Sequence, residues 1–236
     1  YNVVNITKPP SAVKPEKLTA YEGGLKGTLL DGSLQYSAAV FQYRIEDLQT
    51  LTVSLQSSGA ITIENAGKTR IRGADIDLTW QPLPESLPGL VVTGSGAYLK
   101  GKYLSYPDAT GFNALGIFVS NLDFTGNTTT RTPKYSFNSG LNYRFDLNDG
   151  AIEAGVSVYR NDGYFFNPGN TIEQDAYTLL NAQASYTYDP WGLRLSVIGQ
   201  NLSKSEYLAN AFETDFNTVI NYAAPRTVLG RIELMF

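Results

Sequence analysis

Apolar and polar residues alternate with a period of two over long stretches of the chain, which is the pattern of β-strands with two different faces. Helical periodicity appears over no useful length. Counted from the C-terminus, the pattern predicts strands at 225–236, 192–202, 174–188, 151–161, 131–146, 89–103, 68–81, 32–53 and 18–30. We therefore expect an all-β, antiparallel protein of about nine strands.

The connections between the predicted strands alternate strictly between short and long. Three short connections carry Asp-Gly or Asp-Pro turns and the fourth is rich in proline; they lie at 30–32, 81–89, 148–150 and 189–192. The long connections lie at 54–67, 104–130, 161–173 and 203–224. Outer-membrane β-barrels have short periplasmic turns and long extracellular loops, so the alternation favours a transmembrane barrel. Residues 1–17 are then the end of an extracellular loop, and 203–224 form the last one.

The faces of the predicted strands differ as a membrane barrel requires. In 131–146, Leu141 and Phe145 share one face, whereas Asn142 and Arg144 share the other. In a barrel the apolar face meets lipid and the polar face lines the lumen. Four aromatic residues of the apolar parity lie near a short turn or the chain end: Trp80, Phe145, Tyr188 and Phe236. We expect them to form an interfacial aromatic girdle.

Basic residues of the same apolar parity recur near the opposite ends of the predicted strands. They are Lys17, Arg44, Arg72, Lys100, Arg160 and Arg226. Strands of about 9–11 residues cross a bilayer, so these cations should emerge at its outer surface. We expect a basic belt that binds lipopolysaccharide phosphates through charge-assisted hydrogen bonds.

Composition excludes several classes of function. The chain has no Cys and no His, which argues against metal centres, cofactors and thiol or imidazole catalysis. The net charge of −4 without a basic cluster argues against nucleic acid as a partner. Asp75 and Asp77 resemble a glycosidase pair in spacing, but a solvated lumen wall explains them better. Gly94 and Gly96 lack the third glycine of a dinucleotide loop, because position 99 is leucine. We expect no enzyme.

The chain begins at Tyr1 without a start Met or a signal peptide, and we expect a processed product or a fragment. An odd strand number and two unpaired edges disfavour a complete small outer-membrane pore or autotransporter-type barrel, because open edges are costly in lipid. A secreted, β-rich carbohydrate-binding module would pack its apolar faces inward. The alternation of short and long connections disfavours that second alternative.

Four segments resemble one family, the TonB-dependent outer-membrane receptors. YEGGLKGTLLDGSLQYSAAVFQYRIEDLQ at 21–49 is similar to a late barrel segment, and NAGKTRIRGADIDLTW at 65–80 is similar to the strand after it. GQNLSKSEY at 199–207 and APRTVLGRIELMF at 224–236 resemble the two closing strands. The segments occur in the family's order and, with the strands between them, cover nearly the whole chain.

The resemblance implies the last nine or so strands of a 22-stranded barrel, with the N-terminal plug outside this sequence. It implies a location in the Gram-negative outer membrane and active uptake of a scarce solute, most often a ferric siderophore. Energy would come from the TonB complex, which acts through the plug. The terminal aromatic Phe236 matches the signal that the barrel-assembly machinery recognises in such proteins.

Loop aromatics are the candidates for contact with the solute, since exposed rings can stack on a chelate or a sugar. One group is formed by consecutive residues of a long loop, Tyr164, Phe165 and Phe166. Three further aromatics are spaced along another long loop, Phe112, Phe118 and Phe124. The alternative is that these rings only hold the loops together. We favour 164–166.

Overall fold

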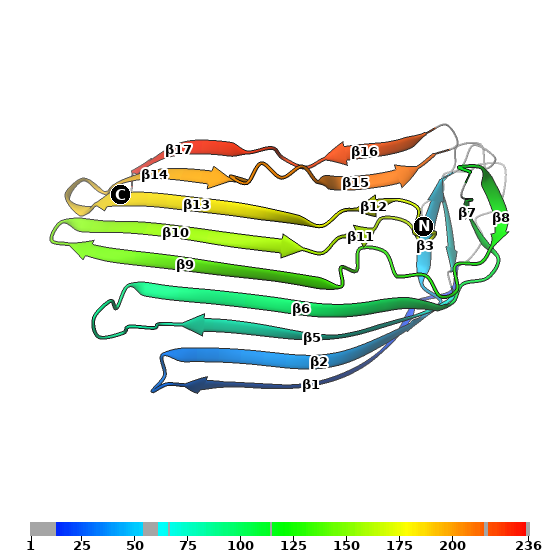
Figure 1. Cartoon of the computed structure of the whole chain (residues 1–236), viewed down its shortest axis with the longest axis horizontal. Helices are drawn as coiled ribbons and strands as arrows, with labels where there is room; N and C mark the ends of the chain where they lie inside the picture. The colour runs from blue at the N-terminus through cyan, green and yellow to red at the C-terminus, as the bar shows by residue number, and fades with distance from the viewer. Residues whose placement is uncertain (1–12, 54–60, 66, 114, 215–216, 235–236) are drawn as a thin grey trace.

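The computed structural model describes residues 13–53, 61–65, 67–113, 115–214 and 217–234. Within these residues, nine long strands pair antiparallel in one sheet, each beside the next long strand along the chain (Figure 1). Their bounds are β1 Lys17–Leu29, β2 Leu34–Glu46, β5 Lys68–Trp80, β6 Leu90–Ser105, β9 Tyr135–Leu147, β10 Gly150–Asn161, β13 Tyr177–Tyr188, β14 Leu193–Gln200 and β17 Thr227–Leu234. The predicted antiparallel all-β fold is confirmed. None of the described segments forms a helix long and apolar enough to cross a membrane.

The four long connections contain two-stranded hairpins that the alternation did not predict. They are β3 Gln49–Val53 with β4 Ile61–Asn65, β7 Ala109–Phe112 with β8 Phe118–Leu122, β11 Tyr164–Phe165 with β12 Glu173–Gln174, and β15 Leu208–Glu213 with β16 Thr218–Tyr222. A short 3₁₀ turn, Asp189–Trp191, joins β13 to β14. The long connections are therefore folded, not structureless, over much of their described length.

Two predicted strands need correction. The predicted strand 32–53 is two strands, because Asp47 has a left-handed φ of 55° that ends β2. Asn65 Nδ2 donates a hydrogen bond of 2.7 Å to the Asp47 carbonyl and fixes this bend. The strand predicted from 131 begins at Tyr135, because the Arg131 N–H donates to the carbonyl of Phe165 in a neighbouring loop.

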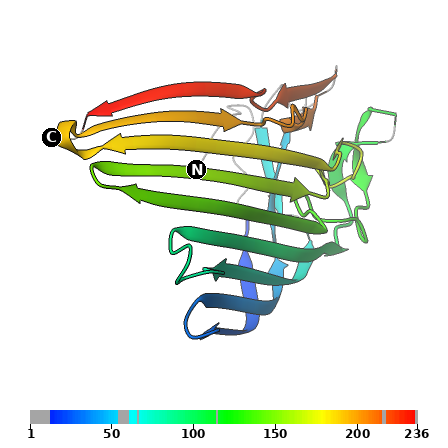
Figure 2. The ribbon, with the colours of Figure 1, turned by 60° about the vertical axis from the view of Figure 1, so that its left-hand side comes forward.

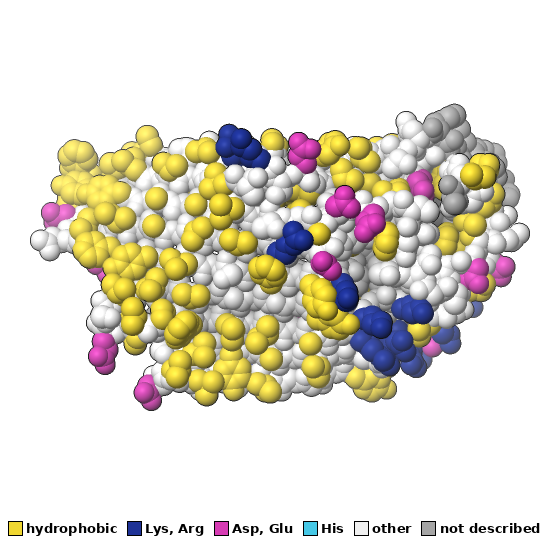
Figure 3. Space-filling model, in the orientation of Figure 1, with side chains coloured by type: hydrophobic (Ala, Val, Ile, Leu, Met, Phe, Trp, Pro, Cys, Tyr) yellow, Lys and Arg dark blue, Asp and Glu magenta, His cyan; other side chains and the backbone are white. Residues whose placement is uncertain are grey.

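The nine-stranded sheet is curved, with one convex and one concave face, as the turned view shows (Figure 2). Cross-strand register places apolar residues of five successive strands side by side on the convex face: Phe145, Ile152, Tyr186, Leu195 and Ile232. Their side chains are between 38% and 74% exposed. Figure 3 shows apolar side chains spread over this face. No second layer covers this face in the described residues, whereas an inward-packed module would cover it.

The buried core lies among the loops and not against the sheet's apolar face. Tyr103, Tyr106, Ala109 and Phe124 form its centre, at the end of β6 and in the loop that follows. Tyr106 packs edge-on against Phe124 with ring centroids 5.4 Å apart. The nine-stranded sheet has no packed core of its own in the described chain, as expected for the wall of a barrel whose apolar face is solvated by lipid.

Candidate functional site

A row of aromatic side chains marks the convex face where the strands meet the short turns. Trp80, Phe145 and Tyr188 lie in this row, and Phe236 lies outside the described residues. Trp191 extends the row: it is 74% exposed and packs edge-on against Tyr188 with ring centroids 5.4 Å apart. The strand pattern missed Trp191 because it lies in a turn. Rings at this level suit a membrane interface, and the girdle role of these residues stays a prediction.

A second, shorter aromatic row lies on β6 and β9 of the convex face, nearer the long loops. Tyr98 and Tyr135 are register partners with ring centroids 5.2 Å apart, and Phe137 lies beside them. Ten residue steps separate Tyr135 from Phe145 in β9, which is about 34 Å along the strand. At the usual strand tilt of about 45° this is about 24 Å across the membrane, close to the height of the apolar band of outer-membrane barrels. The two rows are therefore spaced like the two interfaces of a bilayer.

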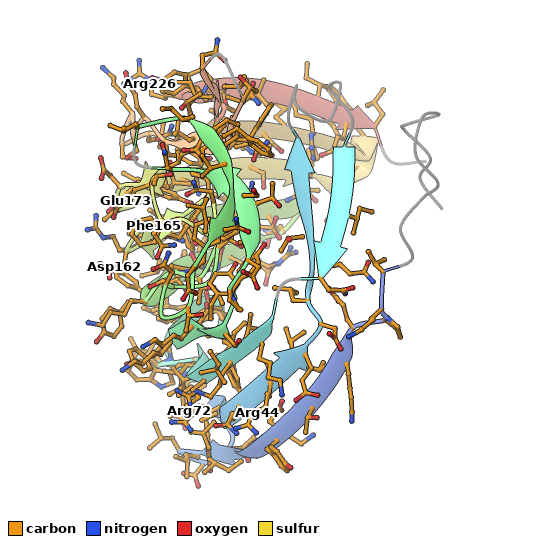
Figure 4. The ribbon with its side chains drawn as sticks, turned by 90° about the vertical axis from the view of Figure 1, so that its right-hand side faces the viewer. Arg44, Arg72, Asp162, Phe165, Glu173 and Arg226 are labelled. Carbon is orange, nitrogen blue, oxygen red and sulfur yellow. The ribbon has the colours of Figure 1, made fainter. Side chains whose placement is uncertain are left out.

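The predicted basic residues all belong to the convex side but do not form one continuous belt. Arg44, Arg72 and Lys100 lie on the neighbouring strands β2, β5 and β6, whereas Arg226 lies at the far side of the sheet (Figure 4). Arg160 Nη1 donates to Thr178 Oγ1 at 3.0 Å. Lys17 is the register partner of an acidic residue, Glu46. Among the predicted cations in the described part of the chain, Arg44, Arg72 and Lys100 lie together on β2, β5 and β6, and the lipopolysaccharide role of the six residues stays a prediction.

Arg70 and Lys102 join this gathering, although the sequence analysis missed them. Arg70 is the register partner of Arg44 and of Lys102, and Arg72 is the register partner of Lys100. We call these residues the cationic patch: Arg44, Arg70, Arg72, Lys100 and Lys102. In Figure 3 the patch is the dark blue group near the loop end of the sheet. Basic residues recur with a spacing of two in β5 and in β6, and this spacing could have identified Arg70 and Lys102 from the sequence.

The concave face carries most of the polar side chains of the long strands. Near the short turns, Glu153 accepts hydrogen bonds from Arg144 at 2.6 Å and Arg194 at 2.5 Å. Further along, uncharged amides line a hollow of the face, which we call the amide wall: Asn138, Asn142, Asn181, Gln183 and Gln200. Tyr207 also lines this hollow and connects it with the loops. A wall of neutral donors and acceptors suits the passage of a hydrophilic solute.

Above the amide wall, aromatic rings from four segments meet at the loop end of the concave face. Tyr177 stacks on Tyr207 with ring centroids 4.4 Å apart, and Tyr159 packs against Tyr177 at 6.0 Å. Tyr164 meets Phe166 edge-on at 5.2 Å. All five rings are half-buried. They converge because β10, β13 and the loops after β10 and β14 are neighbours in the fold.

A cation completes this group of rings. The Arg131 guanidinium lies 5.2 Å from the centroid of Phe166, and its Nη2 donates to Asn210 Oδ1 at 2.7 Å. Burial raises the pKa of the Tyr164 phenol, although the positive charge of Arg131 acts to lower it. Tyr164 is therefore a neutral hydrogen-bond donor at physiological pH. We call the whole group the mouth cluster: Arg131, Tyr159, Tyr164, Phe166, Tyr177 and Tyr207.

The structure divides the predicted aromatic triplet. Tyr164 and Phe166 belong to the mouth cluster, whereas Phe165 lies on the convex side with Asp162 and Glu173 (Figure 4). Neighbouring strand residues face opposite ways, so the short strand β11 separates Tyr164 from Phe165. Tyr159, Tyr177 and Tyr207 were not predicted from the sequence, because two of them lie in predicted strands and the third in a different loop.

The other three predicted aromatics serve loop packing in the structure. Phe112 and Phe118 meet edge-on across the β7–β8 hairpin with centroids 5.3 Å apart. Phe112 and Phe124 are each only 8% exposed. These contacts match the alternative of loop packing, and a role in solute contact stays a prediction for Phe112, Phe118 and Phe124.

The loops around the mouth cluster are tied to one another. Thr128 and Asn170 exchange two hydrogen bonds of 2.9 Å between loops. Asn167 Nδ2 and Thr171 Oγ1 both donate to the Glu213 carboxylate, each at 2.8 Å. Among the described residues, no group of three or more acidic side chains is placed to hold a metal ion. The arrangement therefore offers rings, neutral hydrogen-bonding groups and one cation to a solute.

Known proteins share this architecture. The family model for the β-barrel of TonB-dependent receptor-like proteins matches residues 1–202. The pesticin receptor of Yersinia enterocolitica is 22% identical over 213 residues, which are 90% of this chain and 28% of that receptor. The crystal structure of the ferric yersiniabactin uptake receptor FyuA from Yersinia pestis is similar with a TM-score of 0.70 at 22% identity, over 91% of this chain and 29% of FyuA.

The siderophore receptor PiuA from Acinetobacter baumannii is also similar, with a TM-score of 0.70 and 19% identity over 92% of this chain and 28% of PiuA. The fold and its two faces thus define part of the wall of an outer-membrane β-barrel. The chain belongs to the TonB-dependent receptor family, whose members are outer-membrane proteins of Gram-negative bacteria. It spans less than a third of the length of these relatives.

Proposed function

We propose that this chain is the C-terminal part of a receptor barrel that takes up a ferric siderophore, with energy from the TonB complex acting through a plug. Two structural relatives are described as a ferric yersiniabactin uptake receptor and a siderophore receptor. In this arrangement, residues before β1 end an extracellular loop and 203–224 form the last loop. The proposed role is transport and not catalysis, with Asp75 and Asp77, which share one face of β5, as part of the lumen wall.

The mouth cluster carries the proposal. Rings offer faces on which the aromatic groups of a chelate can stack, and the Arg131 guanidinium attracts a negatively charged complex. Tyr207 links this cluster to the amide wall, so a solute released from the rings meets neutral hydrogen-bonding groups next. The cluster is the entrance site and the amide wall is the adjoining surface of the passage.

The test uses the full-length receptor and two variants of one hairpin. Tyr164→Ala/Phe166→Ala removes two rings of the mouth cluster, and Phe165→Ala removes the ring between them that faces the convex side. Two lost ring contacts are expected to weaken binding about 10- to 100-fold. Phe165→Ala should bind normally, because its side chain lies away from the lumen.

Binding is measured by titration with catecholate, hydroxamate and carboxylate ferric siderophores, and uptake by transfer of radioactive iron into cells. Uptake should disappear in cells that lack TonB. Unchanged affinity of the double variant would remove the mouth cluster from the site. Failure of every siderophore class to support uptake would overturn the iron assignment.

A further inference from the structure

The cationic patch is a dense group of like charges on adjacent strands. Arg44 is opposite Arg70, Arg70 is opposite Lys102, and Arg72 is opposite Lys100. Directly opposite residues of an antiparallel pair have Cβ atoms about 5 Å apart, and like charges at such positions destabilise the sheet. Three facing pairs therefore need a compensating anion.

The chain supplies no such anion from its described residues. None of the five patch cations has an ion pair there, and the nearby Glu46 carboxylate pairs with Lys68 at 3.2 Å. Arg72 Nε donates to the Gln42 side-chain oxygen at 2.7 Å, which fixes the guanidinium and leaves its two terminal nitrogens for another acceptor. Arg72 is thus held in place without its charge being paired.

The patch also lies at a defined height on the convex face. In β6, Lys100 and Lys102 follow Tyr98 of the loop-side aromatic row towards the loops. Two residue steps are about 7 Å along a strand, so Lys100 lies just beyond the aromatic row. That is the level of the headgroups of the outer leaflet, because the aromatic row marks the edge of the apolar band.

We propose that the cationic patch binds phosphate groups of lipopolysaccharide in the outer leaflet. Arginine forks match phosphate oxygens in a bidentate manner, and charge-assisted hydrogen bonds of this kind are strong. The patch spans three strands, about 10 Å, which is wide enough to contact more than one phosphate. Bound phosphates neutralise the three facing like-charge pairs. The site is thereby confined to β2, β5 and β6, and the remaining convex cations are not part of it.

Two variants with the same chemical change test the proposal in the full-length receptor. Arg70→Gln/Arg72→Gln removes two guanidinium groups from the patch, and Arg160→Gln/Arg226→Gln removes two from elsewhere on the convex side. A mobility shift between unheated and heated samples on gels, equal to the shift of the parent, shows that both variants form barrels. Lipopolysaccharide bound to the receptor is then measured by mass spectrometry after delipidation and titration with purified lipid A.

The patch variant is expected to bind bis-phosphorylated lipid A about 30-fold more weakly than the parent, and the control variant about as well as the parent. The parent should bind dephosphorylated lipid A as weakly as the patch variant does. Equal losses in both variants, or equal binding of the two lipids, would overturn the proposal. Displacement of lipid A by millimolar inorganic phosphate would also contradict it, by showing a site for free phosphate. None of these outcomes depends on which solute is transported.

Discussion

The two faces of the nine-stranded sheet differ in how they treat charge. On the concave face Arg144 and Arg194 share the Glu153 carboxylate, so the charges are paired within the protein. On the convex face the patch cations face one another and have no ion pair in the described residues. This difference fits two media: the Glu153 network pairs its charges within the protein beside water, whereas the cationic patch has the phosphates of lipid as its proposed partners.

A single strand shows the same contrast for uncharged residues. In β9, Leu141 is 44% exposed on the convex face, and its neighbour Asn142 lines the hollow of the concave face. In a soluble protein, the face that carries Leu141 would be covered by other parts of the protein. Contact with a bilayer is therefore the explanation for the exposed apolar residues of the convex face.

An arginine placed on each face of β9 in turn should produce the largest difference in the free energy of unfolding. Leu141 lies near the midpoint between the two aromatic rows, so Leu141→Arg should destabilise the barrel by about 2–4 kcal/mol in a bilayer. Asn142→Arg, one step along the strand, should change the free energy of unfolding by less than about 0.5 kcal/mol. Urea unfolding of the full-length receptor in vesicles measures both. Equal costs for the two variants would contradict the assignment of the faces.

Breaking the paired charges should have a smaller effect. Glu153→Gln removes the shared partner of Arg144 and Arg194, and we expect a loss of roughly 1 kcal/mol because the network is partly exposed. Glu233→Gln is the control, since its contact with Arg231 is longer at 3.7 Å. The control should lose less stability in the same unfolding measurement. A larger loss for Glu233→Gln would show that the Glu153 network does not stabilise the concave wall.

The fold could be predicted from the sequence because it depends on local alternation. Period-two patterns placed the strands and both faces, and short turns with Asp-Gly or Asp-Pro set their order. The break between β2 and β3 could not be predicted, since the left-handed Asp47 is fixed by Asn65 from a segment 18 residues away. Such a bend is decided by tertiary contact and has no local signal.

The mouth cluster could be predicted only in part, for a similar reason. The aromatic run at 164–166 was visible, but its partners Tyr159, Tyr177 and Tyr207 come from other segments that pairing brings together. The cationic patch could also be predicted only in part, because the strand parity identified Arg44, Arg72 and Lys100. Arg70 and Lys102 required the cross-strand register, which places like charges opposite one another.

The most direct test of the two-faced wall is a scan of nitroxide labels through 137–145 of β9, which is free of native cysteines as is the rest of this chain. In the full-length receptor in a bilayer, labels at Phe137, Ser139, Leu141, Tyr143 and Phe145 should collide mainly with dissolved oxygen, which partitions into lipid. Labels at the four positions between them should be less accessible to oxygen and more accessible to a water-soluble nickel complex. Alternation in the opposite phase, or no alternation, would contradict the assignment of the convex face to lipid.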